Sequence, residues 1–561
     1  MHPGGVPSLG ATLRLLHKQR RADIIAHLRS LDHDARFVTS AHAALGEPPT
    51  FANLRCGVWH VPPTVASSGH CYFKSTDGHA GQWGFSLTRL NMQVAIAAVT
   101  CAGGVIIVDS TRSGKRYPDS LSKTVPIWCC VLNRAVAAAR SVSSWDTALL
   151  LPPWVPPSEA AQIEERLAGW VEMLRRPALT PVLSRLAEVL DRPLRPSWLC
   201  PLVEAEASYA ARASAVQEAA AARGAPFAWV HCVCASEVCT AEEARARASY
   251  TYIQGAGDDD ENWARGLTAA QWWRWRDELI PLAARDHEAA ERRLAELRER
   301  DGCEGVSLGG TEGGAAGGGD SGGAERGEAA QTERPCALWG SRLLLGPRVS
   351  AAAPAVWMYA DAVLDVGSPM RGAGAVVDLA GSDMAACAAI DVADISDGAS
   401  CPGSSISCPP AFLHVPIMDE SPGNSKRTQP SRDWWQRVVL PRSLSFIHAH
   451  LSAGRRVVVC CERGDDRSPT IAAAALLALF EADATTLAEA EGGGAKIGVL
   501  SKEDVRARLA LLQGAYPAAR VPRRLLKELN QFFVAPEGGF LRWRAHARSG
   551  DTWWTTDGAC A

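Results

Sequence analysis

Residues 457–470 read VVVCCERGDDRSPT. The apolar run that begins at Val457 predicts a buried strand, because short apolar runs that end in a polar loop are typical of strands covered on both faces. The run leads Cys461 into a loop with Gly464 three residues on and Arg467 six residues on, and an alanine-rich helical segment follows. This strand, loop and helix order predicts an α/β fold, in which functional residues lie at the carboxyl ends of strands.

A second region has the same order. Residues 103–111, GGVIIVDST, form an apolar run that ends in a charged loop, and the helical IWCCVLNRAVAAA follows. Between the two regions, residues 302–335 contain twelve glycines and no aromatic residue, so they cannot bury enough surface to offset chain entropy. We therefore predict an α/β domain over residues 1–301, a flexible linker over 302–335 and a second α/β domain over 336–561.

Composition narrows the class of protein. Of 561 residues, 47% are hydrophobic and 21% charged, as in globular proteins. The formal charge is −3, and the linker alone holds six acidic residues against two arginines, so the rest of the chain is near neutral. A nucleic-acid surface would therefore have to be a local basic patch. Seventeen cysteines without a secretory leader or a long apolar run predict a reducing compartment, a cytoplasmic location and no membrane.

The loop after Val457 has the parts of an anion site. Successive backbone N–H groups, a helix N-terminus and the guanidinium of Arg467 together form a site for a phosphate dianion, and the same field would lower the pKa of Cys461. The spacing C-x2-G-x2-R-S resembles the signature of dual-specificity phosphatases. That resemblance implies phosphate contacts from Cys461, Gly464, Arg467 and Ser468.

The match to the phosphatase pattern has departures. The resemblance also implies a general acid at Asp419, which follows an expected strand. However, Cys460 stands where the pattern has histidine, and Asp465 and Asp466 would oppose a dianion unless they point outward. The alternative is a strand-to-helix turn in which Cys461 is a core residue.

Three segments of the first domain are dense in chemically capable residues. They are YFKSTDGHAGQW (72–83), VDSTRSGKRYPDSLSKT (108–124) and YIQGAGDDDENWARGLT (252–268). Together with LRCGVWHVPP (54–63) and PLRPSWLCP (193–201), they resemble the initiator tRNA phosphoribosyltransferase family, in which a family-specific domain precedes a phosphatase-like domain. The resemblance covers most of residues 28–279 and continues weakly into the second half.

This resemblance implies a reaction. The protein would transfer 5-phosphoribosyl from phosphoribosyl pyrophosphate to the 2′-hydroxyl of a T-stem purine, position 64, of initiator methionine tRNA, which excludes that tRNA from elongation. Its partners would be this tRNA and the donor, with Mg²⁺ as cofactor and no DNA. The alternatives are a dual-specificity-type phosphatase that acts on RNA or protein through Cys461, and a tRNA-binding protein without activity.

The reaction implies roles for residues of the three segments. Mg²⁺ prefers carboxylates together with substrate oxygens, for which Asp109, Asp258 and Asp259 are the candidates. The attacking hydroxyl needs a base, for which Asp77 and His79 remain alternatives. Substrate phosphates need cationic and hydroxyl donors. The candidates for these contacts are Lys74, Ser110, Thr111, Arg112, Lys115, Arg116 and Lys123.

Several of these features have structural readings. The acids of residues 258–261 can form a solvated loop, and the basic loop 112–116 can contact tRNA phosphates rather than the donor. HCVC at 231–234 has the wrong spacing for a zinc pair and fits a strand over 227–233 better. The tryptophans of residues 271–279 have helical spacing and predict core, whereas VPRRLLK (521–527) and FLRWRAHAR (540–548) could contact a nucleic-acid backbone.

Overall fold

The structure is a computed structural model, and it describes twelve stretches of the chain. These are residues 23–66, 69–76, 81–112, 114–201, 226–238, 250–304, 335–348, 360–367, 411–415, 434–481, 500–535 and 539–549. The chain divides into two compact units. The first contains residues 1–174 and 186–323, and the second contains residues 175–185 and 324–561. The assignment of residues 175–185 to the second unit has no signal in the sequence.

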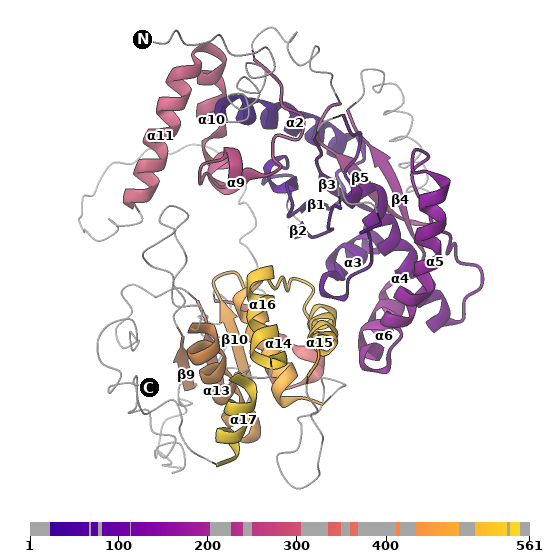
Figure 1. Ribbon diagram of the computed structural model, residues 1–561, viewed down its shortest axis with the longest axis vertical. Coiled ribbons are helices and arrows are strands. Elements are labelled where there is room, and N and C mark those ends of the chain that lie inside the picture. The colour runs from indigo at the N-terminus through magenta and orange to yellow at the C-terminus, as the bar shows by residue number, and fades with distance from the viewer. Residues whose placement is uncertain are drawn as a thin grey trace, which may run out of the picture. The chain divides into compact units, whose positions relative to one another are not determined.

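The first unit is built on a five-stranded parallel sheet (Figure 1). Its strands are β1 (Thr50–Asn53), β2 (His70–Cys71), β3 (Val105–Asp109), β4 (Leu194–Leu199) and β5 (Ala228–Cys234), and their order is β2-β1-β3-β5-β4. All five residues of β3 are buried, which explains the continuous apolar run of the sequence. The strand that was expected over residues 227–233 is β5.

Helices cover this sheet and extend the unit. They are α2 (Ile24–Ala44), α3 (Met92–Thr100), α4 (Val125–Arg140), α5 (Pro157–Leu174), α9 (Asp260–Trp263), α10 (Ala269–Arg285) and α11 (His287–Glu304), while α6 (Thr180–Val189) crosses the division between the units. In α10, Trp272 and Trp275 are buried in one cluster with Leu28 and Leu31 of α2. The tryptophans of residues 271–279 therefore include core residues, as their spacing predicted.

The second unit has a five-stranded sheet of its own. Its strands are β6 (Cys336–Ala337), β7 (Leu343–Pro347), β8 (Ala362–Asp365), β9 (Ala411–His414) and β10 (Val457–Cys461), in the order β6-β7-β10-β8-β9, and only the β6–β7 pairing is antiparallel. Its helices are α13 (Leu440–Ser452), α14 (Arg467–Leu479), α15 (Lys502–Ala515), α16 (Arg523–Val534) and α17 (Gly539–Ser549). The opening stretch of sequence is thus the central strand, its loop and α14. Both units have the α/β fold that the sequence predicts.

No helix in the described stretches is both long and apolar enough to cross a membrane.

Candidate active site at the carboxyl edge of the first sheet

The loops that follow β1 and β3 meet a third loop at the carboxyl edge of the first sheet. A Cβ atom at Gly57 would lie 2.2 Å from the carbonyl oxygen of Val108, so the loop after β1 packs directly on β3. Gly255 has φ +67°, and a Cβ atom there would lie 2.6 Å from the carbonyl oxygen of Thr111. Because only glycine permits these approaches, three segments that are remote in sequence converge here.

Asp109 ends the central strand and is completely buried. One carboxylate oxygen accepts from the Cys56 thiol (2.9 Å) and from the backbone N–H of Ser110 (2.9 Å). The other accepts from the Asn53 amide (2.8 Å), the Arg55 guanidinium (3.3 Å) and the Ser120 hydroxyl. With both oxygens fully engaged, Asp109 fixes the positions of its neighbours and has no lone pair directed at a substrate.

Arg55 joins this buried acid to the acidic loop. Its guanidinium lies 3.3 Å from Asp109 and 3.0 Å from Asp258, and it also donates to the carbonyl oxygen of Ser110. Burial opposes the charge of Arg55, but the carboxylates of Asp109 and Asp258 raise its pKa above the usual value. The guanidinium is thus permanently charged and rigidly held.

Arg112 forms the outer part of the same cluster. It lies 2.9 Å from Asp258 and also pairs with Asp259, and its side chain is 38% exposed. Ser110 and Thr111, which precede it, are buried, and the Ser110 hydroxyl has no hydrogen-bond partner among the described residues. The structure therefore brings together five of the predicted site residues: Asp109, Ser110, Arg112, Asp258 and Asp259.

The remaining predicted cations differ in their surroundings. Lys123 lies 3.2 Å from Asp119 and 2.8 Å from Glu159, and although burial opposes its charge, these two carboxylates raise its pKa. Lys115 lies 4.0 Å from Asp119, and Arg116 is exposed. Lys123 is thus neutralised within the protein, which makes it a weaker candidate for a phosphate contact. Asp77 and His79, the two candidates for the general base, lie outside the described residues.

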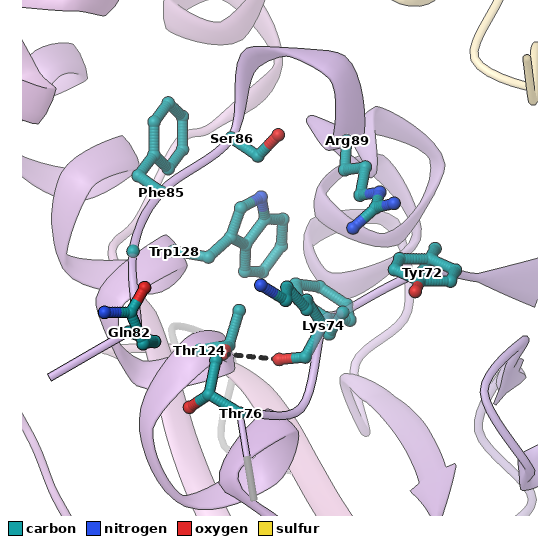
Figure 2. A pocket seen from close by; sticks show the side chains of 11 residues that line it. Tyr72, Lys74, Thr76, Gln82, Phe85, Ser86, Arg89, Thr124 and Trp128 are labelled. Atoms are coloured by element: carbon teal, nitrogen blue, oxygen red, sulfur yellow. Dashed lines mark hydrogen bonds between the residues drawn. The ribbon is translucent and has the colours of Figure 1, made fainter. Parts of the chain in front are cut away.

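A cavity of about 200 Å³ adjoins this cluster (Figure 2). Among the described residues, its lining comprises Tyr72, Phe73, Lys74, Thr76, Gln82, Gly84, Phe85, Ser86, Arg89, Thr124 and Trp128. The Asn53 amide connects it to the cluster: Nδ2 donates to the carbonyl oxygen of Phe73 (2.9 Å) as well as to Asp109, and Oδ1 accepts from the N–H of Phe73 (2.9 Å). Of the predicted site residues that the structure describes, Lys74 lines the cavity.

The described residues do not form a metal cage. No group of three or more histidine, cysteine or acidic side chains among them is arranged to hold a metal ion. Both oxygens of Asp109 are taken, and Asp258 faces two guanidinium groups. Of the three predicted ligands, Asp109 is buried, whereas the side chains of Asp258 and Asp259 are 14% and 49% exposed, so the role of these two with Mg²⁺ stays a prediction.

His231 of HCVC has a structural role in β5. One ring nitrogen lies 2.7 Å from the Ser197 hydroxyl and the other 3.1 Å from the carbonyl oxygen of Gly103. Burial lowers the pKa of His231 to about 4. The imidazole is therefore a neutral part of the core, with both nitrogens engaged, and this agrees with the strand interpretation of this segment.

The predicted phosphate loop lies in the second unit, between β10 and α14. Gly464 has φ +76°, and a Cβ atom there would lie 2.6 Å from the backbone nitrogen of Pro347. The Cys461 sulfur lies 3.1 Å from the Ser468 hydroxyl and 3.5 Å from the carboxylate of Asp466, which also accepts from the N–H of Arg467 (2.6 Å). Asp466 thus points into the loop and places a negative charge beside the thiol.

This arrangement corrects the expectation for Cys461. Burial raises the pKa of the thiol; Ser468 opposes this change and Asp466 adds to it, so the prediction of a lowered pKa is wrong. Arg467 lies 3.2 Å from Glu462, which neutralises the predicted phosphate ligand. Cys460 is buried and burial raises its pKa too. Asp419, the predicted general acid, lies outside the described residues.

Family models match both units of the chain. The model described as the Rit1 N-terminal domain matches residues 17–297, and the model described as the Rit1 DUSP-like domain matches residues 427–533. The first of these matches alone covers half of the chain. The chain belongs to the Rit1 family. This confirms the resemblance to the initiator tRNA phosphoribosyltransferases, with a phosphatase-like second domain.

Two curated relatives of this Rit1 family chain come from yeasts. An uncharacterised protein of Schizosaccharomyces pombe is 40% identical over 258 residues, which are 45% of this chain and 52% of the relative. The tRNA A64-2′-O-ribosylphosphate transferase of Saccharomyces cerevisiae is 35% identical over 230 residues, 40% of this chain and 44% of the relative. The chain spans about half the length of the curated relatives it matches.

Two solved phosphatase structures also match. They are a mouse putative dual specificity phosphatase complexed with zinc tungstate and a human DUSP28 variant, with TM-scores of 0.22 and 0.21 and identities of 15% and 14%. The matches cover 40% and 39% of this chain and 98% and 100% of the two structures. At such TM-scores they add nothing to the description of the fold.

Several residues of this Rit1 family site were not predicted from the sequence. Asn53 is the last residue of β1 and lies outside every motif segment named from the sequence. Arg55 lies in the segment 54–63, for which no single residue was predicted, and Arg89 and Trp128 of the cavity lie in segments without any motif. A signal existed for Arg55, because a polar residue in the loop that follows a parallel strand lies at the functional edge of the sheet. Arg89 and Trp128 come from helical segments and gave no such signal.

Proposed function

We propose that this protein transfers 5-phosphoribosyl from phosphoribosyl pyrophosphate to the 2′-hydroxyl of a T-stem purine, position 64, of initiator methionine tRNA. The observation that carries the proposal is the convergence of Arg55, Arg112, Asp109 and Asp258 beside a cavity at the carboxyl edge of a parallel sheet. The Saccharomyces cerevisiae relative, a tRNA A64-2′-O-ribosylphosphate transferase, supports the choice of reaction.

The reaction forms a bond between the tRNA 2′-oxygen and C1′ of the donor, and it breaks the bond between C1′ and pyrophosphate. The 2′-hydroxyl loses its proton to a base, for which Asp77 and His79 remain the candidates. The departing pyrophosphate takes the electron pair, so cations must lie where its charge develops. Arg112, which is partly exposed, and Arg116, which is exposed, can supply that charge.

Magnesium enters this proposal together with the donor. Mg²⁺ is usually bound by one or two carboxylates plus substrate phosphates, and it would neutralise charge on the pyrophosphate. Asp258 and Asp259 would supply the protein ligands, although both are paired with Arg112. Arg112 holds these carboxylates in place.

The tRNA contact in this proposal rests on exposed cations of the second unit. Arg523, Arg524 and Lys527 on α16 and Arg542 on α17 are exposed. A T stem is an A-form helix, which proteins recognise mainly by shape and by backbone contacts. Such recognition needs a local group of cations and tolerates the near-neutral charge of the whole chain.

Incorporation of labelled donor into tRNA tests the proposal. Initiator methionine tRNA should take up label in the presence of Mg²⁺, whereas elongator tRNA and samples with a chelator should not. Cys461→Ser should retain transfer within about twofold, because the raised pKa of Cys461 and the neighbouring Asp466 disfavour a nucleophilic thiolate. The absence of label on every tRNA would refute the reaction. Hydrolysis of an aryl phosphate that depends on Cys461 would then support the phosphatase alternative.

A further inference from the structure

The cavity beside the charge cluster has a chemically selective lining (Figure 2). Two cations, Lys74 and Arg89, line it together with the hydroxyls of Thr76, Ser86 and Thr124, and no described lining residue is acidic. Figure 2 shows Lys74 and Trp128 near the middle, with Tyr72 and Arg89 to one side and Gln82 to the other. A lining of this kind suits a small ligand with an anionic group and several hydroxyls.

The walls of the cavity are fixed before any ligand binds. The Asn91 amide accepts from the N–H of Tyr72 (3.0 Å) and donates to its carbonyl oxygen (3.1 Å). The Trp128 indole donates to the carbonyl oxygen of Leu90 (2.7 Å), and the guanidinium of Arg89 lies 3.7 Å from the centre of the Tyr72 ring. Groups held in this way lose little conformational freedom on binding, which favours affinity.

Lys74 differs from the other lysines of this site. Its carbonyl oxygen accepts from the Thr124 hydroxyl (2.8 Å), which fixes the backbone, while its side chain is exposed. No carboxylate of the described residues pairs with its ammonium group, whereas Lys123 lies near two, Asp119 and Glu159. The described residues therefore leave the positive charge of Lys74 without a neutralising carboxylate, and it remains available to an anion.

The position and size of the cavity limit the ligand further. Asn53 links Phe73 of the lining to Asp109, so a ligand in the cavity lies next to the charge cluster. A volume of about 200 Å³ is below the roughly 300–1,000 Å³ that is usual for small-molecule sites. It suits one sugar phosphate better than a whole nucleotide.

We propose that this cavity binds the phosphorylated pentose of the donor, with its 5-phosphate on Lys74 and Arg89 and its sugar beside Trp128. The hydroxyl oxygens of Thr76, Ser86 and Thr124 would accept hydrogen bonds from the sugar hydroxyls, because the hydroxyls of Thr76 and Thr124 already donate to Asp119 and to the carbonyl oxygen of Lys74. The pyrophosphate on C1′ would extend outside the cavity, and the charge cluster that Asn53 joins to Phe73 is its proposed binding site. The identity of the sugar rests on the proposed function, whereas the anion site rests on the lining alone.

Calorimetric titration of the full chain with ribose 5-phosphate tests the site. Wild type should bind it, and Lys74→Ala should bind at least about tenfold more weakly, which is the loss expected for one charged hydrogen bond. Lys74→Arg should recover part of the affinity. Lys502→Ala, which removes an exposed lysine of the second unit, is the matched control and should bind as wild type. Thermal melting checks that each variant is folded.

Three other results would each overturn the site. They are unchanged affinity in Lys74→Ala, equal affinity of wild type for ribose without phosphate, and tighter binding of adenosine than of ribose 5-phosphate, which would indicate a base site. The two proposals fail separately. Binding that depends on Lys74 in a protein that labels no tRNA would leave the site standing without the reaction. If Lys74→Ala transfers phosphoribose to tRNA with unchanged rate and unchanged KM for the donor, the reaction stands and the proposed site does not.

Discussion

The two units end their central strands in opposite electrostatic settings. In the first unit, β3 ends at Asp109, a buried carboxylate that is satisfied by five donors, among them Arg55. In the second unit, β10 ends at Cys461, a buried thiol that faces the carboxylate of Asp466. Both loops contain arginines, and the first lies beside a cavity whose lining includes Lys74, a lysine that pairs with no carboxylate of the described residues. The more conspicuous motif therefore marks the less suitable anion site.

The difference shows what a loop motif establishes. C-x2-G-x2-R-S fixes backbone geometry, since Gly464 is required by its approach to Pro347, and it leaves open which group occupies the centre of the loop. In this chain the carboxylate of Asp466 points into the loop, where it would repel a phosphate. The guanidinium of Arg467, which would bind a phosphate, is neutralised by Glu462. Whether the loop binds phosphate depends on Glu462 and Asp466, which occupy positions that the motif leaves unspecified.

The largest expected effect comes from removing the acid that organises the first unit. Asp109→Ala should lower the free energy of unfolding by roughly 3–5 kcal/mol, because it leaves the buried guanidinium of Arg55 without its innermost partner. Transfer to tRNA should disappear as well. Urea unfolding, followed by hydrogen exchange of the β3 amides, measures the loss in this unit.

Asp361→Ala is the control for that experiment in the second unit. Asp361 pairs with Arg456 at 3.3 Å, and both side chains are more than 40% exposed. An exposed pair of this kind contributes at most about 1 kcal/mol, and the hydrogen bond that Asp361 accepts from the backbone N–H of Arg456 (2.8 Å) contributes about 1 kcal/mol more. Equal losses in the two variants would show that Asp109 does not have the organising role described here.

A smaller effect is expected when the pH falls. The pKa of His231 is about 4 in the folded protein, because burial lowers it, whereas an unfolded chain gives about 6.5. The unfolded state therefore takes up the proton first, so stability is complete above pH 6.5 and is lost between pH 6.5 and 4. From pH 7 to pH 5 the loss from this group should be about 2 kcal/mol.

His231→Asn isolates this contribution. The variant should be less stable at pH 7, because Ser197 and Gly103 lose their partner, but its stability should depend less steeply on pH. Burial also lowers the pKa of His448 and His450 in the second unit, so hydrogen exchange of the β5 amides is needed to measure the first unit alone. The same pH slope in wild type and variant would contradict the role of His231.

The sequence predicted the parts of the fold that local pattern determines. The apolar runs of β3 and β10 identified the central strands, and parallel order placed Asp109 and Cys461 at carboxyl edges. Pairings such as Arg55 with Asp258 could not be predicted, because they join residues about two hundred positions apart through packing of three loops. The direction of the Asp466 side chain toward Cys461 could not be predicted either, because it depends on the conformation of the loop.

The smallest expected effect concerns the thiol of the second unit. Asp466→Asn removes a negative charge beside Cys461, so the pKa of Cys461 should fall, although burial, the larger cause, still holds it above the usual value. Alkylation of Cys461 by iodoacetamide at pH 8 should become about three- to tenfold faster, since one pKa unit changes the thiolate fraction tenfold. Peptide mass spectrometry follows Cys461 separately from the other cysteines.

Asp465→Asn is the matched control, because Asp465 faces Arg463 (3.3 Å) and Arg520 (3.6 Å) rather than the thiol. If both variants react at the wild-type rate, the charge of Asp466 does not hold Cys461 in its thiol form, and the contrast between the two edges loses its electrostatic basis.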